Sequence, residues 1–160
     1  MKKKGYIQDF LFFGIIILII AVVFISVNLL LKEINTNIQG SDMSSNAKDM
    51  MSEQTGGFAV VYDNIFIMVF FMFILGIIVS YYVIQTNPAL FFPIAFIFAF
   101  ILVVFAITGN VFDKFNDDPT IASSADEFEG TSWIMGHIVE IMVILGFVGI
   151  TALLAKNYLT

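Results

Sequence analysis

The chain has 160 residues, of which 59% are hydrophobic and 12% are charged, and its formal net charge at pH 7 is −6. Soluble domains average about 45–50% apolar and about 25% charged residues, so this composition indicates a small integral membrane protein. The sequence has no cysteine, which excludes disulfides, thiolate metal sites and thiol nucleophiles. Every basic residue is a lysine, and without arginine's bidentate guanidinium we expect no nucleic-acid partner.

The first apolar run extends from Leu11 to Leu31 and follows three lysines near the N-terminus. A secretory signal peptide has an apolar core of about 7–15 residues that ends at a small-residue cleavage site. This run is longer and has no such exit. We therefore predict an uncleaved transmembrane helix over residues 10–32.

Residues 33–62 are rich in Asn, Ser, Gly, Gln and acids, which predicts an extramembrane loop. Within it Met43, Ala47, Met50 and Met51 recur at helical spacing, with Gly56 as a stop. The spacing favours a short amphipathic helix on the membrane surface or against a partner. A mobile loop is the alternative.

Two long apolar runs follow and meet at the polar turn Gln85–Pro88. Each has about 21 residues without a charge, enough for a helix to cross the ~30 Å hydrocarbon layer. We predict transmembrane helices over 63–86 and 88–110, joined as a hairpin. The first of them begins either at Phe58 or at Asp63.

The second predicted loop covers residues 111–131, and a fourth span covers 132–156, with Thr131 or Ser132 as its N-cap. Asp113, Asp117 and Asp118 in the loop are a weak cation-binding candidate. They lack the calcium-loop spacing with a central glycine and a terminal glutamate, so a solvated acidic face is favoured. The fold class predicted for residues 1–160 is one all-α membrane domain, a bundle of four transmembrane helices with two acidic extramembrane loops.

Four spans place the N-terminus, the Gln85–Pro88 turn and the C-terminus on one face. That face carries four lysines and one aspartate, a net charge of +3, whereas the opposite face carries three lysines and eleven acids, a net charge of −8. Lysine excess near span ends is typical of the cytoplasmic side. We predict cytoplasmic termini and acidic loops on the outer side.

Glu140 and His137 are three residues apart in the fourth span and share a helix face. A straight helix from Ser132 would place Glu140 roughly 12 Å inside the membrane. A carboxylate there costs about 2.5–3.5 kcal/mol even on permissive scales, so it should be paired, protonated or hydrated. Asn28 and Asn110 fall at comparable depth, which predicts a buried polar cluster in the outer half of the bundle.

This cluster has two interpretations. It is an ion or proton site, or half of one that a partner completes, or it is a set of structural hydrogen bonds that fixes helix register. The inner half of the bundle has no matching polar groups, which argues against a continuous proton wire. One histidine and one His-x-x-Glu motif do not suffice for a metal site held by this chain alone.

Catalytic triads, phosphate loops and nucleotide fingerprints are absent from the sequence, so we expect no enzyme activity and no cofactor. We predict a non-catalytic structural or accessory subunit of a larger membrane assembly, whose partners are the lipid bilayer and other membrane subunits or copies of itself. The alternatives are a proton- or cation-conducting channel or transporter subunit that uses Glu140 and His137, and a holin-like pore-forming protein. Small four-span proteins of similar composition also include membrane proteins of lipid-containing viruses, and no motif selects among these classes.

Overall fold

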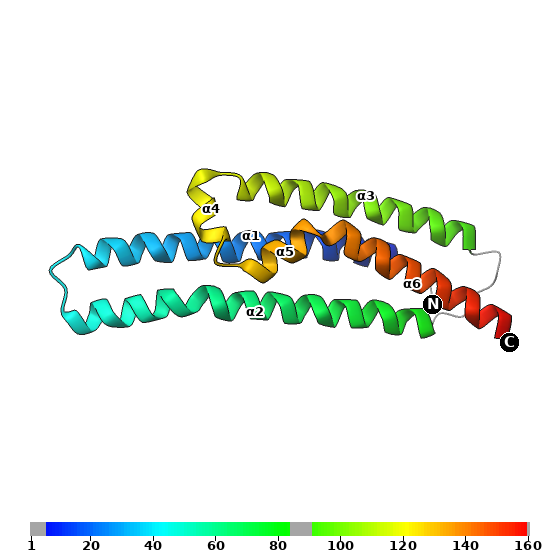
Figure 1. The fold of residues 1–160 in the computed structure, drawn as a ribbon, viewed down its shortest axis with the longest axis horizontal. Coiled ribbons are helices and arrows are strands. Elements are labelled where there is room, and N and C mark those ends of the chain that lie inside the picture. Colours follow the sequence, from blue (N-terminus) through cyan, green and yellow to red (C-terminus); the bar gives the residue numbers. More distant parts are fainter. Residues whose placement is uncertain (1–5, 84–90, 160) are drawn as a thin grey trace.

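The computed structural model describes residues 6–83 and 91–159, and all regular structure in these two ranges is helical. The helices are α1 (Tyr6–Gln39), α2 (Ser45–Val83), α3 (Phe91–Asn116), α4 (Pro119–Ala125), α5 (Glu129–Gly136) and α6 (Ile138–Leu159). The long helices α1, α2, α3 and α6 run along the length of the molecule, and α4 and α5 lie near the end of α3 (Figure 1). The predicted all-α class is confirmed for this part of the chain. The predicted turn Gln85–Pro88 lies outside the described residues.

Three helices are long and apolar enough to cross a membrane, within Ile15–Gln39, Ser45–Val79 and Phe98–Asn116. A fourth span results if the bent pair Glu129–Gly136 and Ile138–Ala152 is counted as one. The fourth predicted span is therefore not the single straight helix expected over 132–156. It is broken at His137, where the two helices meet at an angle of 62°.

The prediction of a loop over residues 33–62 is wrong, because almost all of this segment is helical. α1 continues to Gln39 and α2 begins at Ser45, so only five residues between them are not in a helix. The two helices extend past α4 as a projecting hairpin (Figure 1). The expected stop at Gly56 is also wrong, since α2 runs through it to Val83.

Packing between the two helices explains why the hairpin is helical despite its polar composition. Thr55 and Ala59 of α2 are buried, with 7% and 3% of their surface exposed. Tyr62 packs against Phe58 and also against Phe24 of α1, with ring centroids 4.2 Å and 4.8 Å apart. These contacts outweigh the helix penalty of glycine, which is about 1 kcal/mol per residue.

The predicted loop over residues 111–131 is likewise mostly helical. α3 continues to Asn116, and α4 begins at Pro119 after the N-cap Asp118, whose carboxylate accepts a hydrogen bond from the backbone N–H of Thr120. Proline suits the first helical position because its missing N–H has no partner there anyway. α5 then leads through the break at His137 into α6.

The hydrophobic core between the helices follows the spacing of successive helical turns. Ile17, Ala21 and Ile25 of α1 are four residues apart and each has at most 1% of its surface exposed. Phe66 and Phe70 of α2 are each 2% exposed. Phe105 and Phe112 of α3 and Met142 of α6 complete this core. One face of each long helix is thus used for packing, and the remaining faces are exposed.

Gly146 of α6 lets α3 approach closely. A Cβ atom built on Gly146 would lie 1.8 Å from Cζ of the Phe98 ring, well inside contact distance. We expect Gly146→Ala to lower the stability of the bundle by about 1–3 kcal/mol, because the ring must leave its position. Thermal unfolding in detergent micelles measures the difference.

Gly76→Ala is the matched control, because a Cβ on Gly76 meets no heavy atom within 4 Å. This variant should be as stable as the wild type or slightly more so, since alanine is the better helix former. Equal stabilities of the two alanine variants would contradict the close approach of Phe98 to Gly146.

Candidate functional site

The first polar contact between helices in the described part of the chain centres on Asn28 of α1. Its side chain is completely buried. The amide Nδ2 donates to Oγ of Ser124, at 3.2 Å, and to Oε2 of Glu127, at 2.8 Å. A buried amide needs partners because leaving it unsatisfied costs about 1–3 kcal/mol. The α4 region supplies both acceptors for Nδ2, so Asn28 joins that region to α1, whereas the buried Oδ1 of Asn28 has no hydrogen-bond partner in the described part of the chain.

Lys32 lies one turn beyond Asn28 and binds the other oxygen of the same carboxylate. Its Nζ is 2.8 Å from Oε1 of Glu127, and it also donates to the carbonyl oxygen of Ser123, at 3.2 Å. Partial burial raises the pKa of Glu127, but the hydrogen bonds from Lys32 and Asn28, together with the charge of Lys32, outweigh it. The pKa of this carboxyl therefore lies below its ordinary value.

A second polar contact joins α2 to the start of α5. The carboxylate of Asp63 accepts hydrogen bonds from the backbone N–H of Gly130, at 3.0 Å, and from the N–H and hydroxyl of Thr131, both at 2.7 Å. These are the second and third residues of α5, whose amides a local N-cap side chain would otherwise satisfy. The residue at the N-cap position is Phe128, which makes no side-chain cap. Asp63 therefore caps α5 from another helix.

Gly130 is required for this contact. A Cβ atom at this position would lie 2.3 Å from Cδ1 of Ile67 and 3.0 Å from Oδ2 of Asp63. Asn28, Lys32, Asp63, Ser124, Glu127 and Thr131 are called the interhelical polar cluster below. The sequence prediction found Asn28 but missed its partner Glu127 and all of the Asp63 contact, because nothing in the sequence separates these two acids from their acidic neighbours.

The structure does not bring the four residues of the predicted membrane cluster together. Asn28 is buried, whereas Asn110, His137 and Glu140 are exposed on the surface of the chain. No side-chain hydrogen bond or ion pair links Asn110 or Glu140 to another residue within 6–83 or 91–159. Asn28 is thus paired with Glu127 of the α4–α5 connection and not with Glu140.

The helix break changes the depth expected for Glu140. The sequence estimate assumed a straight helix from Ser132, but α6 begins at Ile138, so Glu140 is its third residue. It therefore lies in the first turn of the helix, where the N–H groups lack intrahelical partners and the helix dipole favours negative charge by about 0.3–1 kcal/mol. An acid at this position needs no deep partner in the bundle.

His137 lies at the break itself. Its backbone N–H bonds to the carbonyl oxygens of Trp133 and Ile134, which ends α5, and its ring stacks on Trp133 with centroids 4.8 Å apart. The ring Nδ1 is 2.9 Å from the carbonyl oxygen of Trp133. These contacts are with the last turn of α5, which His137 terminates.

Asp113, Asp117 and Asp118, the weak cation-binding candidate, are all exposed. The carboxylate of Asp118 is the N-cap of α4. It accepts hydrogen bonds from the Thr120 hydroxyl, which lowers the pKa of Asp118 most, and from the Thr120 N–H, which lowers it further. Across the described residues, no three His, Cys, Asp or Glu side chains are grouped closely enough to hold a metal ion.

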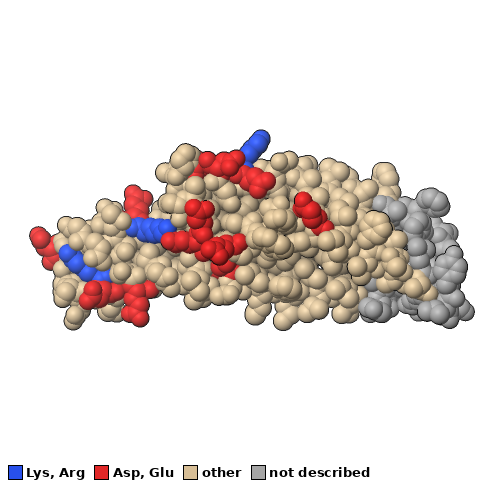
Figure 2. All heavy atoms as spheres, viewed as in Figure 1, with Lys and Arg blue, Asp and Glu red and all other residues tan. Residues whose placement is uncertain are grey.

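Figure 2 shows where the charges gather on one face of the molecule. Nearly all acids and lysines visible lie over the projecting hairpin, over α4 and α5, and over the end of α3 next to α4. Most of the remaining visible surface that the structure describes, over the bodies of α3 and α6, is uncharged. The interhelical polar cluster thus lies where the charged part of the chain meets the apolar part.

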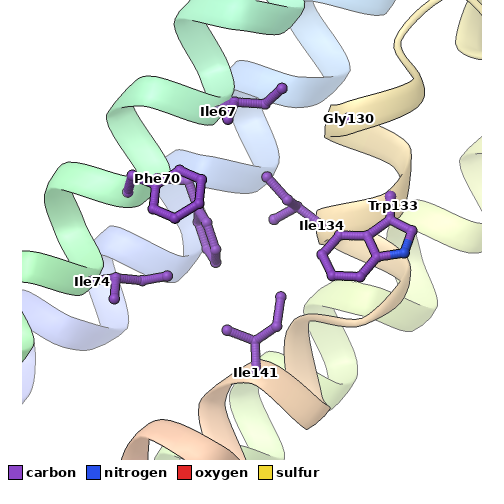
Figure 3. A pocket seen from close by; sticks show the side chains of 8 residues that line it. Ile67, Phe70, Ile74, Gly130, Trp133, Ile134 and Ile141 are labelled. Carbon is purple, nitrogen blue, oxygen red and sulfur yellow. The ribbon is translucent and has the colours of Figure 1, made fainter.

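An apolar hollow of about 350 Å³ lies beside this boundary, between α2 on one side and α5 and α6 on the other (Figure 3). Ile67, Phe70, Phe71 and Ile74 line it from α2. Gly130, Trp133 and Ile134 of α5 and Ile141 of α6 line it from the opposite side. None of the eight carries a charged side chain.

The Glu127 contacts predict a pH dependence of stability. Its pKa is lower in the folded chain than in the unfolded chain, so the carboxylate stabilises the fold above its ordinary pKa of about 4.3, and this contribution is lost as pH falls through the lower folded value. We expect Glu127→Gln to be about 1 kcal/mol less stable at pH 7. The difference should shrink below pH ~4.

Thermal unfolding of both proteins in detergent at several pH values measures this difference. Asp113→Asn is the control, because it removes an exposed acid outside the cluster and should not change stability at either end of the range. A stability difference between Glu127→Gln and wild type that stayed constant down to acidic pH would contradict the ion pair.

Comparisons of the chain with protein-family models, with curated proteins and with solved structures found no match. Two structural features bear most on function. They are the hydrogen bonds of the interhelical polar cluster and the exposed position of Glu140 at the start of α6.

Proposed function

We propose that the chain is a non-catalytic structural or accessory subunit of a larger membrane assembly. The observation that carries this proposal is Glu140, an exposed acid near the start of α6 whose side chain bonds to no other described residue. It is the only charged or polar residue in the first 13 residues of that helix, Ile138–Ile150. His137 and Asn110 are exposed as well. Polar groups on the outward side of a membrane helix are best satisfied at the headgroup level or by a neighbouring subunit.

The large exposed apolar surface supports the same proposal. In the three candidate spans only 22%, 17% and 28% of the apolar window is buried inside the chain. Exposed aromatic side chains include Phe71 at 59%, Phe96 at 78% and Phe147 at 72%. This surface is available to lipid and to other membrane subunits or copies of the same chain.

The distribution of buried polar side chains gives no support to a channel through one copy of the chain. Among the described residues the buried polar ones are Asn28, Thr55, Thr108, Ser124 and Thr131. All lie in the projecting hairpin, in the interhelical polar cluster or in the second half of α3. The rest of the core, from Ile17 to Met142, is apolar and offers no path for an ion.

The arrangement that accompanies this proposal is a bundle of four membrane spans. Three of them are α1, α2 and α3, and the fourth is the bent pair α5–α6, which is long and apolar enough to cross the hydrocarbon layer when its two helices are counted together. The acidic hairpin and α4 then lie outside the membrane on the outer side, with both termini on the cytoplasmic side. In support, α1 begins and α6 ends at the end of the molecule opposite the hairpin tip (Figure 1).

Glu140→Gln tests the proposed role. If the chain is a structural subunit that contacts its neighbours near Glu140, the variant should weaken assembly of the native complex, and liposomes with either protein should show no proton or cation flux. Flux in the wild type that vanishes in Glu140→Gln with assembly intact would contradict the structural role and favour an ion-conducting subunit. Glu53→Gln, at an exposed acid of the projecting hairpin, is the control and should leave assembly unchanged.

The proposed orientation is tested with single cysteines in a chain that has none. Ser44, at the hairpin tip, and Ser123, on α4, are exposed. We expect Ser44→Cys and Ser123→Cys to react with a membrane-impermeant maleimide on intact cells. Protection of both until the cells are permeabilised would reverse the orientation, and protection of one alone would contradict the four-span arrangement.

A further inference from the structure

The apolar hollow between α2 and the α5–α6 bend has the shape of a chain-binding groove. Ile67, Phe70 and Ile74 are spaced three and four residues apart, so they form one face of α2 about 10 Å long. Figure 3 shows Ile67 and Gly130 at one end of the hollow and Ile74 and Ile141 at the other. The hollow thus lies alongside two turns of α2, whose axis is the direction of the acyl chains in a bilayer that α2 crosses.

The walls of the hollow suit hydrocarbon and no polar ligand. All eight lining residues are apolar or glycine, and the Asp63 carboxylate at its upper end is already bonded to Gly130 and Thr131. The indole of Trp133 turns its six-membered ring toward the hollow, and its nitrogen lies on the far side (Figure 3). The volume of about 350 Å³ is within the range of about 300–1,000 Å³ found for small-molecule pockets.

The charge around the upper end restricts the headgroup of such a lipid. Asp63 lies beside Gly130, and Glu129 and Asp126 are exposed nearby in the sequence. Lys32 of α1 is already paired with Glu127. An anionic headgroup would meet like charge here, whereas a headgroup with an ammonium and no net charge would not.

We propose that the hollow binds one acyl chain of a zwitterionic phospholipid, with the headgroup beside the Asp63–Gly130 contact and the chain along Phe70 and Ile74. This rests on the proposed placement of α2 in the bilayer and goes further by naming a ligand. The hollow includes the bend at His137, since Trp133 and Ile134 line it from α5 and Ile141 lines it from α6.

Trp133 is the only tryptophan in the chain, so its fluorescence reports on this site without a label. The full chain in bromine-free detergent micelles is titrated with phosphatidylcholine brominated on its acyl chains, and separately with brominated phosphatidylglycerol. We expect quenching by phosphatidylcholine to saturate near one lipid per chain. Half-saturation with the anionic lipid should require about fivefold more lipid.

Two variants place a larger side chain in the hollow and leave the fluorophore Trp133 unchanged. They are Ile74→Phe on α2 and Ile141→Phe on α6. Both should abolish saturable quenching, and circular dichroism confirms that each remains helical. Ile144→Phe is the control, because Ile144 is 63% exposed on α6 and does not line the hollow, so its quenching should match the wild type.

Quenching that rises linearly with the brominated fraction, or that is equal in Ile74→Phe, Ile141→Phe and wild type, would overturn the site. Equal or stronger quenching by phosphatidylglycerol would overturn the headgroup assignment. The titration uses the isolated chain, so its outcome is separate from the flux and assembly measurements on Glu140→Gln. A failure of the structural role would leave the lipid site standing, and the reverse also holds.

Discussion

The polar hydrogen bonds from α1 and α2 to the chain between α3 and α6 are the constraint on which the rest of the structure depends. Asn28 and Lys32 bind Glu127, and Asp63 caps α5. Without these bonds α4 and α5 would be only marginally stable as helices, since isolated helices below about 12–15 residues are marginal in water. These bonds set where α6 begins, and with it the level of Glu140 and the walls of the apolar hollow.

Much of the fold could be predicted from hydrophobic composition. Long uncharged runs predicted helices over 10–32, 63–86 and 88–110, and α1, α2 and α3 contain the described parts of these ranges. The two predicted loops were wrong because polar composition was taken to end a helix. Burial of Thr55 and Ala59 between α1 and α2 overrides the weak propensities of Ser, Asn and Gly, and such packing between helices does not show in the sequence of either one.

The candidate site could be predicted only in part, for two physical reasons. Asn28 was identifiable because an amide in an apolar run needs a partner, but the partner comes from a segment 99 residues away, where Glu127 is one acid among several. The depth of Glu140 depended on a straight helix, and the break at His137 has no proline to announce it. Gly136 is the only local signal for that break, and glycines elsewhere in the chain, such as Gly57, lie within continuous helix.

The capping of α5 by Asp63 has a consequence for the order of events during biosynthesis. A ribosome releases Asp63 and Asn28 well before Gly130 and Thr131, which follow 67 residues or more later. The polar groups of the first two helices therefore lack these partners until the last third of the polypeptide emerges. The C-terminal part of the chain thus completes these contacts. A chain stalled on the ribosome after α3 would contain Asp63 but not the α5 N-terminus that Asp63 caps.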